Sequence, residues 1–123
     1  MEEKKFILDY MNTCSDFLKK IDISNEAIES KSMILKTINN GGKLLFAGNG
    51  ASASIANHAS LDFTKQGKIR SINFNESAFI TAFANDYGYE HWVENAFKFH
   101  AQKGDTAILI SSSGSSKNLV NAA

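Results

Sequence analysis

The chain has 123 residues, of which 43% are hydrophobic and 21% charged, an ordinary globular composition with enough apolar material for one core. Thirteen basic residues balance thirteen acidic ones, so net charge gives no general attraction to nucleic acid or to anionic lipid. A single cysteine, Cys14, excludes an internal disulfide, and no apolar run has the length of a signal peptide or a membrane span. We therefore expect a cytoplasmic protein that binds neither nucleic acid nor membranes.

Two helices are predicted in residues 1–40. The second begins near Ser24, a suitable N-cap, and runs to about Asn39, where Gly41 and Gly42 end it. The first carries large side chains at steps of three and four, the spacing of one helical face. This face packs either on its own domain or across a subunit interface, and the pattern leaves both open. Its members are Phe6, Ile7, Tyr10, Met11, Cys14, Phe17, Leu18 and Ile21.

Short apolar runs alternate with helical segments through residues 41–123. Strands are predicted at 44–47, 69–74 and 106–110, and helices at 52–65, 77–84, 91–101 and after residue 116. This alternation predicts an α/β fold with a doubly wound parallel sheet and right-handed crossovers. Because such sheets usually have more than three strands, we expect residues 1–123 to be one domain that is truncated after its third strand. Its helical region would be 1–40, and 41–123 would be the first part of the α/β core.

A glycine-rich loop at residues 48–53 follows the first predicted strand. Glycines let a ligand approach the backbone, and free amides at a helix start attract anions. The loop lacks the lysine of a Walker A motif, but it fits the G-x-G-x-x-G/A dinucleotide pattern, with Glu76 near the place of a ribose-binding acid. A dinucleotide site and a purely structural turn both remain open for this loop alone.

A serine-rich loop at residues 111–116 follows the third predicted strand directly. Ligands of open α/β sheets bind at the carboxyl ends of the strands. Hydroxyls and backbone amides there can surround a phosphate without a lysine, and a dinucleotide fold does not require such a loop. A flexible polar linker is the alternative, but the apolar run at 107–110 immediately before the loop disfavours it.

Both loops resemble those of sugar isomerase (SIS) domains. Residues 44–52 (LLFAGNGAS) resemble the first SIS loop, and 108–116 (ILISSSGSS) resemble the phosphate-binding serine loop. Residues 83–88 (FANDYG) are similar to a motif of the phosphoheptose isomerase branch. The resemblance implies a flavodoxin-like three-layer sandwich preceded by two N-terminal helices. It also implies that Asn49, Gly50, Ala51 and Ser52 line a sugar-phosphate site, that Ser111, Ser112, Ser113 and Ser116 hold the phosphate, and that Asn85 and Asp86 contact the sugar.

His58 and Asp62 are four residues apart on a predicted helix, so both side chains project from one face. In the branch that the chain resembles, the matching positions hold a histidine that binds zinc and a glutamate that binds zinc and acts as base. The resemblance thus implies that His58 and Asp62 are metal ligands and catalytic residues, with the carboxylate one methylene shorter here. An ordinary ion pair on the helix surface is the alternative.

The resemblance implies a phosphosugar isomerase that converts sedoheptulose 7-phosphate into a heptose 7-phosphate for surface polysaccharide. Zinc and a homo-oligomer, a dimer or a tetramer, would accompany this activity, and no nucleotide cofactor is expected. A phosphosugar-binding regulator or scaffold without catalysis is the first alternative, and the aspartate at position 62 favours it. A dinucleotide enzyme is the second alternative.

Overall fold

The computed structural model describes residues 2–123. The chain divides into two compact units, with the boundary between Ser32 and Met33. The first unit contains α1 (Glu2–Lys20) and the start of α2 (Ser24–Asn39). Within this unit α1 buries none of its residues, so the face predicted from the sequence is exposed there, apart from the half-buried Cys14. Ser24 is the first helical residue and not the cap, because its backbone N–H donates to Asp22 Oδ1 at 3.0 Å.

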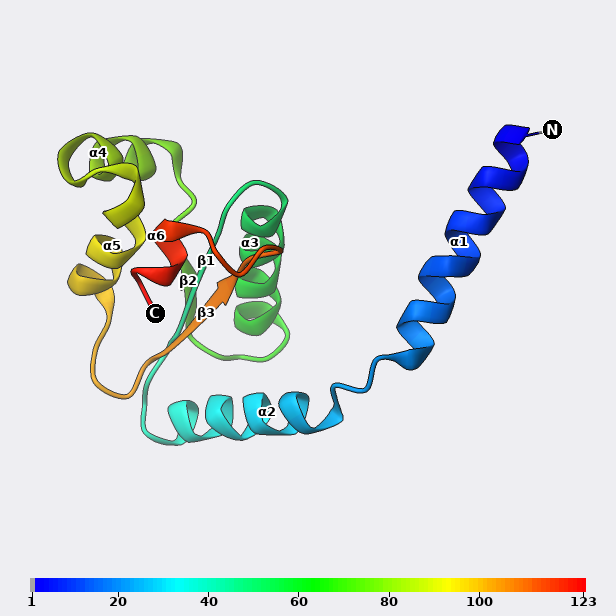
Figure 1. Cartoon of the computed structure of the whole chain (residues 1–123). Coiled ribbons are helices and arrows are strands. Elements are labelled where there is room, and N and C mark those ends of the chain that lie inside the picture. The colour runs from blue at the N-terminus through cyan, green and yellow to red at the C-terminus, as the bar shows by residue number, and fades with distance from the viewer. Residues whose placement is uncertain (1) are drawn as a thin grey trace. The chain divides into compact units, whose positions relative to one another are not determined.

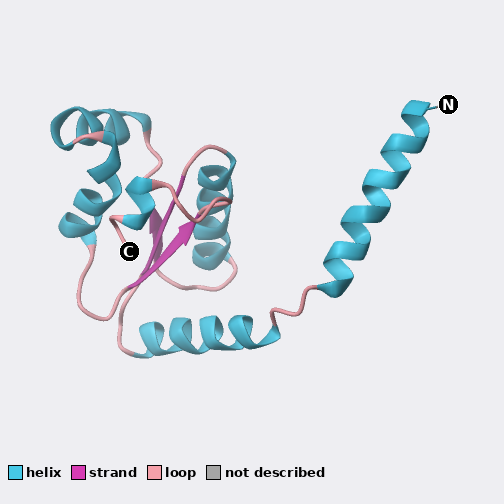
Figure 2. Cartoon of the chain, in the orientation of Figure 1, coloured by secondary structure: helices cyan, strands magenta, loops and turns pink. Residues whose placement is uncertain are grey.

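The second unit, Met33–Ala123, is built on a three-stranded parallel sheet. β1 (Leu44–Gly48) lies between β2 (Ser71–Asn73) and β3 (Thr106–Ile110), which confirms the predicted α/β class. The strands stand out as arrows in Figure 2. The helices of this unit, besides the end of α2, are α3 (Ala51–Lys65), α4 (Ser77–Tyr87), the 3-10 turn η1 (Tyr89–His91), α5 (Trp92–His100) and α6 (Lys117–Val120).

Helices cover both faces of this sheet, with α3 on one side and α5 and α6 on the other (Figure 1). Successive side chains of a strand point to opposite faces. Leu44 and Phe46 accordingly join the core under α3, and Leu45 and Ala47 join the core under α5 and α6. Because both faces of β1 are buried, its sequence is a continuous apolar run instead of an alternating one.

Several boundaries differ from those predicted, most of them by one to three residues. β2 is confined to Ser71–Asn73, shorter than the predicted 69–74. α4 continues to Tyr87, so Asn85 and Asp86 lie in a helix. Of the segment predicted as a helix over 91–101, His91 belongs to η1, and α5 runs from Trp92, which is 1% exposed, to His100. No helix among residues 2–123 combines the length and the apolar character needed to cross a bilayer.

The amino ends of β1 and β3 are fastened together by buried polar contacts. Lys43 Nζ lies 2.5 Å from Asp105 Oδ2, and the backbone N–H of Lys43 donates to Asp105 Oδ1 at 2.9 Å. Thr37, near the end of α2, also contacts β3, because its hydroxyl lies 2.5 Å from that of Thr106. The Lys43–Asp105 contacts hold the two strands together at this end of the sheet, and the loops occupy the carboxyl end.

Candidate functional site

The loops after β1 and β3 meet at the carboxyl end of the sheet. Because the two strands are parallel neighbours, both loops leave the sheet at the same edge. A reciprocal pair of side-chain amides joins them: Asn49 Nδ2 donates to Asn118 Oδ1 at 2.9 Å, and Asn118 Nδ2 donates to Asn49 Oδ1 at 2.8 Å. The structure thus brings together the two segments that the sequence analysis singled out.

The first loop turns tightly into α3. A Cβ on Gly48 would lie 2.5 Å from the carbonyl oxygen of Ser52, so only glycine fits there. Gly50 precedes α3 with φ of 55°, a conformation that glycine adopts readily, and no side chain caps the helix. The amides of Ala51 and Ser52 in the first turn therefore lack an intrahelical partner, and such amides attract anions.

Asn49 uses most of its side-chain hydrogen-bonding capacity within the protein. Its Oδ1 accepts from Asn118 Nδ2 and also from the Tyr89 hydroxyl at 3.1 Å. A side-chain carbonyl has two lone pairs, so both are occupied. What Asn49 offers a ligand is therefore one remaining N–H of its side chain and the backbone beside it. Neither Tyr89 nor Asn118 was predicted from the sequence as part of this site.

Three hydroxyls of the serine loop lie close together, with that of Ser111 between the other two. Ser111 Oγ lies 3.5 Å from Ser113 Oγ and 3.4 Å from Ser116 Oγ, and it accepts the backbone N–H of Gly114 at 3.1 Å. Gly114 has φ of 65°, which bends the loop back on itself. Ser112 and Ser113 are exposed, whereas Ser111 and Ser116 are half-buried. The four predicted phosphate-binding serines thus lie on one compact loop.

His58 and Asp62 lie together on α3, as their spacing predicts. His58 Nε2 is 3.3 Å from Asp62 Oδ2, and the two side chains are 73% and 53% exposed. They line an open depression with Ser54, Ile55 and Ala59. The hydrogen bonds found among residues 2–123 do not connect either side chain to the two loops.

The donors on α3 do not by themselves complete a zinc site. A catalytic zinc takes three protein ligands and keeps one position open for water or substrate. Among residues 2–123 there is no group of three or more histidine, cysteine, aspartate or glutamate side chains placed to share an ion. His58 and Asp62 thus offer two donors of suitable chemistry, and a third would have to come from elsewhere.

The remaining polar residues predicted for the site have other neighbours. Asn85 Nδ2 donates to Asp86 Oδ1 at 3.0 Å on the exposed last turn of α4. Glu76 caps α4, because its carboxylate accepts the backbone N–H groups of Ala78 at 3.0 Å and Phe79 at 2.8 Å. These hydrogen bonds, that from Ala78 foremost, hold the pKa of Glu76 below its ordinary value. Capping of α4 therefore explains an acidic residue at position 76 without a bound ribose.

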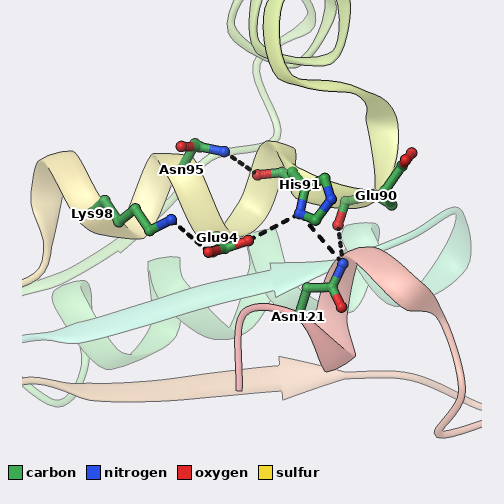
Figure 3. Close-up of polar contacts among 6 residues, drawn as sticks. All are labelled: Glu90, His91, Glu94, Asn95, Lys98 and Asn121. Atoms are coloured by element: carbon green, nitrogen blue, oxygen red, sulfur yellow. Dashed lines mark hydrogen bonds and ion pairs between the residues drawn. The ribbon is translucent and has the colours of Figure 1, made fainter.

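A polar network attaches α6 to the segment around η1 (Figure 3). Asn121 Nδ2 donates to the Glu90 carbonyl oxygen at 2.9 Å and lies 3.5 Å from His91 Nδ1. His91 Nδ1 is in turn 3.0 Å from Glu94 Oε2, which gives this histidine a partner that the sequence did not indicate. Lys98 first and His91 second lower the pKa of the Glu94 carboxyl through hydrogen bonds. The short helix after the serine loop is thereby held at its far end.

Known proteins resemble the chain in both sequence and structure. It is 36% identical over 111 residues to a phosphoheptose isomerase of Aliarcobacter butzleri, with 85% of this chain and 59% of the relative covered. It is 38% identical over 112 residues to the Helicobacter pylori enzyme of that name, with 85% and 58% covered. The chain therefore spans somewhat under three fifths of the length of these curated relatives.

The structure of phosphoheptose isomerase from Neisseria gonorrhoeae superposes with a TM-score of 0.86 at 25% identity, covering 99% of this chain and 67% of that one. A phosphoheptose isomerase structure from Francisella tularensis gives 0.84 at 22% identity, with 99% and 68% covered, a likeness of fold. The family model described as the SIS domain matches residues 9–123. The chain therefore belongs to the SIS domain family.

Proposed function

We propose that the protein is a phosphosugar isomerase that interconverts sedoheptulose 7-phosphate and a heptose 7-phosphate for surface polysaccharide. The observation that carries this proposal is the meeting of the glycine-rich and serine-rich loops at the carboxyl edge of the sheet, joined by Asn49 and Asn118. The relatives at 36% and 38% identity bear the name of this activity, which supports the choice of reaction.

The serine loop would hold the phosphate. The hydroxyls of Ser111, Ser112, Ser113 and Ser116 can donate to phosphate oxygens, and they need no basic residue. The first loop would line the sugar through the backbone of Gly50, Ala51 and Ser52, with free amides at the start of α3. Asn85 and Asp86 would contact sugar hydroxyls. Holding the sugar at both ends would orient the reacting carbons.

Asp62 is the proposed base. The reaction removes a proton from the carbon beside the ketone, passes through an enediolate and places a proton on the former carbonyl carbon, while a hydroxyl proton moves between the two oxygens. Asp62 would transfer the carbon proton, for which it needs an approach of about 3 Å. His58, 3.3 Å from Asp62, would orient the carboxylate and stabilise the developing charge.

Zinc, oligomeric state and location belong to the same proposal. His58 and Asp62 would supply two zinc ligands, and zinc bound there would polarise the substrate oxygens. We also propose a cytoplasmic homo-oligomer, a dimer or a tetramer, without a nucleotide cofactor. Sedimentation as a monomer would contradict the oligomer.

The test is turnover of sedoheptulose 7-phosphate by the full-length protein, with and without added zinc, beside Asp62→Ala. We expect turnover by the wild type and a loss of at least about 100-fold in the variant, the usual contribution of a positioned base. Asp16→Ala, which removes an exposed carboxylate from α1, is the matched control. Absence of turnover with and without zinc would contradict the proposal.

A phosphosugar-binding regulator or scaffold is the second candidate. It is favoured by the exposure of Asp62, 53%, because a general base usually lies in an enclosed site from which water is excluded. Saturable binding of sedoheptulose 7-phosphate without turnover would select this function over the isomerase. Titration with NAD and NADP tests the dinucleotide alternative directly.

A further inference from the structure

We infer that Asn118 is a positioning residue that sets the spacing between the two halves of the sugar-phosphate site. The inference rests on the proposed function, because it concerns the same site. It starts from the reciprocal amide pair, in which Asn118 gives and receives one hydrogen bond, at 2.8 and 2.9 Å, with Asn49.

Burial makes the choice of asparagine at position 118 informative. Asn118 is only 3% exposed, beside Leu119, which is buried in the core under α5 and α6. An apolar side chain would be the simpler occupant of such a position, since burying an amide is costly unless it is hydrogen-bonded. The Asn118 amide both donates a hydrogen bond to Asn49 and accepts one from it. Only a side chain with a donor and an acceptor can make both of these hydrogen bonds.

Asn118 links the amide pair to the phosphate side of the site. Ser116 stands two residues before Asn118, at the residue that precedes α6, and its Oγ lies 3.4 Å from Ser111 Oγ. Ser116 therefore joins the start of α6 to the cluster of serine hydroxyls. Asn121 holds the other end of α6 through the Glu90 carbonyl, so the short helix is attached at both ends.

Asn49 links the same pair to the sugar side. It directly precedes Gly50 and the uncapped first turn of α3. Tyr89 Oη donates to Asn49 Oδ1 at 3.1 Å and restrains the carbonyl side of this amide. A ligand that touches the serine hydroxyls and the α3 amides together spans a gap whose width is set by Asn49 and Asn118. Loss of the pair would weaken such a ligand without altering Asp62 or His58.

The experiment compares Asn118→Leu with Asn95→Leu in the full-length protein, by steady-state kinetics on sedoheptulose 7-phosphate and by thermal unfolding. Asn95 is the matched control, because its part-buried amide makes one hydrogen bond, 2.9 Å to the His91 carbonyl, away from both loops. In Asn118→Leu we expect KM to rise about tenfold or more while kcat changes less than about threefold, since two hydrogen bonds that position the site are lost. Asn95→Leu is expected to lose stability with KM unchanged.

Asn118→Ser is the second variant. The serine hydroxyl can keep one of the two hydrogen bonds, and serine is smaller than asparagine, whereas leucine is larger. We expect its KM to lie between those of the wild type and Asn118→Leu, and it carries the test if the leucine variant does not fold. If the wild type binds the sugar phosphate without turnover, dissociation constants from calorimetry replace KM.

Equal KM or Kd in the wild type and the Asn118 variants would overturn the inference and leave Asn118 a purely structural residue. If the wild type neither binds nor converts the sugar phosphate, the proposed function fails and the inference fails with it.

Discussion

Asp105 receives hydrogen bonds from both the side chain and the backbone of Lys43, so the residues just before β3 and β1 are joined twice. The side chains of Lys43 and Asp105 are 16% and 5% exposed, and the backbone N–H of Gln102 donates to the same carboxylate at 2.8 Å. The Asp105 carboxylate therefore holds three donors together at the amino end of the sheet. The exposed pair Asp16–Lys19 on α1, 3.7 Å apart, offers a direct contrast.

Asp105→Asn is expected to lower the free energy of unfolding by about 3 kcal/mol, because it leaves the Lys43 ammonium largely buried without a counter-charge. Asp16→Asn should change it by less than about 0.5 kcal/mol, as is usual for an exposed pair. Urea unfolding monitored by the fluorescence of Trp92 measures both. Equal effects of the two substitutions would show that the Lys43–Asp105 contact contributes nothing beyond a surface pair.

Asp105 also predicts how stability depends on pH. Burial raises the pKa of its carboxyl, but the hydrogen bonds from Lys43 and from the Gln102 backbone outweigh burial, so the pKa lies below the ordinary value of 3.8. A lowered pKa in the folded state means that the contribution is fully present above the unfolded pKa and is lost as the pH falls through the folded pKa. Wild-type stability should therefore decline below about pH 4. Asp105→Asn should show a shallower decline, and identical acid profiles would contradict this.

Gly42 lies close against the backbone of Gly104 at the amino end of the sheet. A Cβ at this position would lie 2.4 Å from the Gly104 carbonyl oxygen and 2.9 Å from Thr37 Cγ2. Gly42→Ala is expected to cost about 2–3 kcal/mol of stability, since backbone must move to accommodate the methyl group. Gly41→Ala is the matched control: its φ of 74° costs about 1 kcal/mol, but its Cβ meets open space. A smaller loss for Gly42→Ala than for Gly41→Ala would contradict the close approach.

Ser111→Ala removes the hydroxyl around which the serine loop is organised. Gly114 would lose its hydrogen-bond partner, and Ser113 and Ser116 would lose a neighbour. We expect calorimetric titration with sedoheptulose 7-phosphate to show affinity about tenfold weaker, from the loss of one or two hydrogen bonds. Ser32→Ala, which removes an exposed hydroxyl bonded to the Ile28 carbonyl on α2, should leave the affinity unchanged. Undiminished affinity in Ser111→Ala would argue against a phosphate site on this loop.

Sequence patterns predicted those features that depend on local order. The continuous apolar run of β1 follows from burial on both faces, and the spacing of His58 and Asp62 places both side chains on one face of a helix, where the structure has them 3.3 Å apart. The position of the serine loop at the carboxyl end of the sheet was predicted because the loop directly follows an apolar strand. Each of these rests on residues within a few positions of one another.

The features that the sequence did not reveal depend on long-range contacts. Asn118 reads as an ordinary residue of a helix start until β1 and β3 are placed side by side, because its partner lies 69 positions earlier in the chain. Tyr89 contacts Asn49 across 40 positions. The prediction of Ser24 as the N-cap of α2 was wrong for a local reason. The carboxylate of Asp22, two residues earlier, accepts the backbone N–H of Ser24 at the start of the helix.

The strand order β2-β1-β3 has a consequence for how the protein folds. Each strand pair is parallel, so no tight hairpin can begin the sheet, and β3 joins β1 only after the chain between them has closed into a large loop. Proteins dominated by such distant pairings fold slowly. Since the loops after β1 and β3 lie beside each other only when β3 is paired with β1, a sugar phosphate bound to both loops would stabilise that pairing. Such a ligand would therefore also protect β3 from local unfolding.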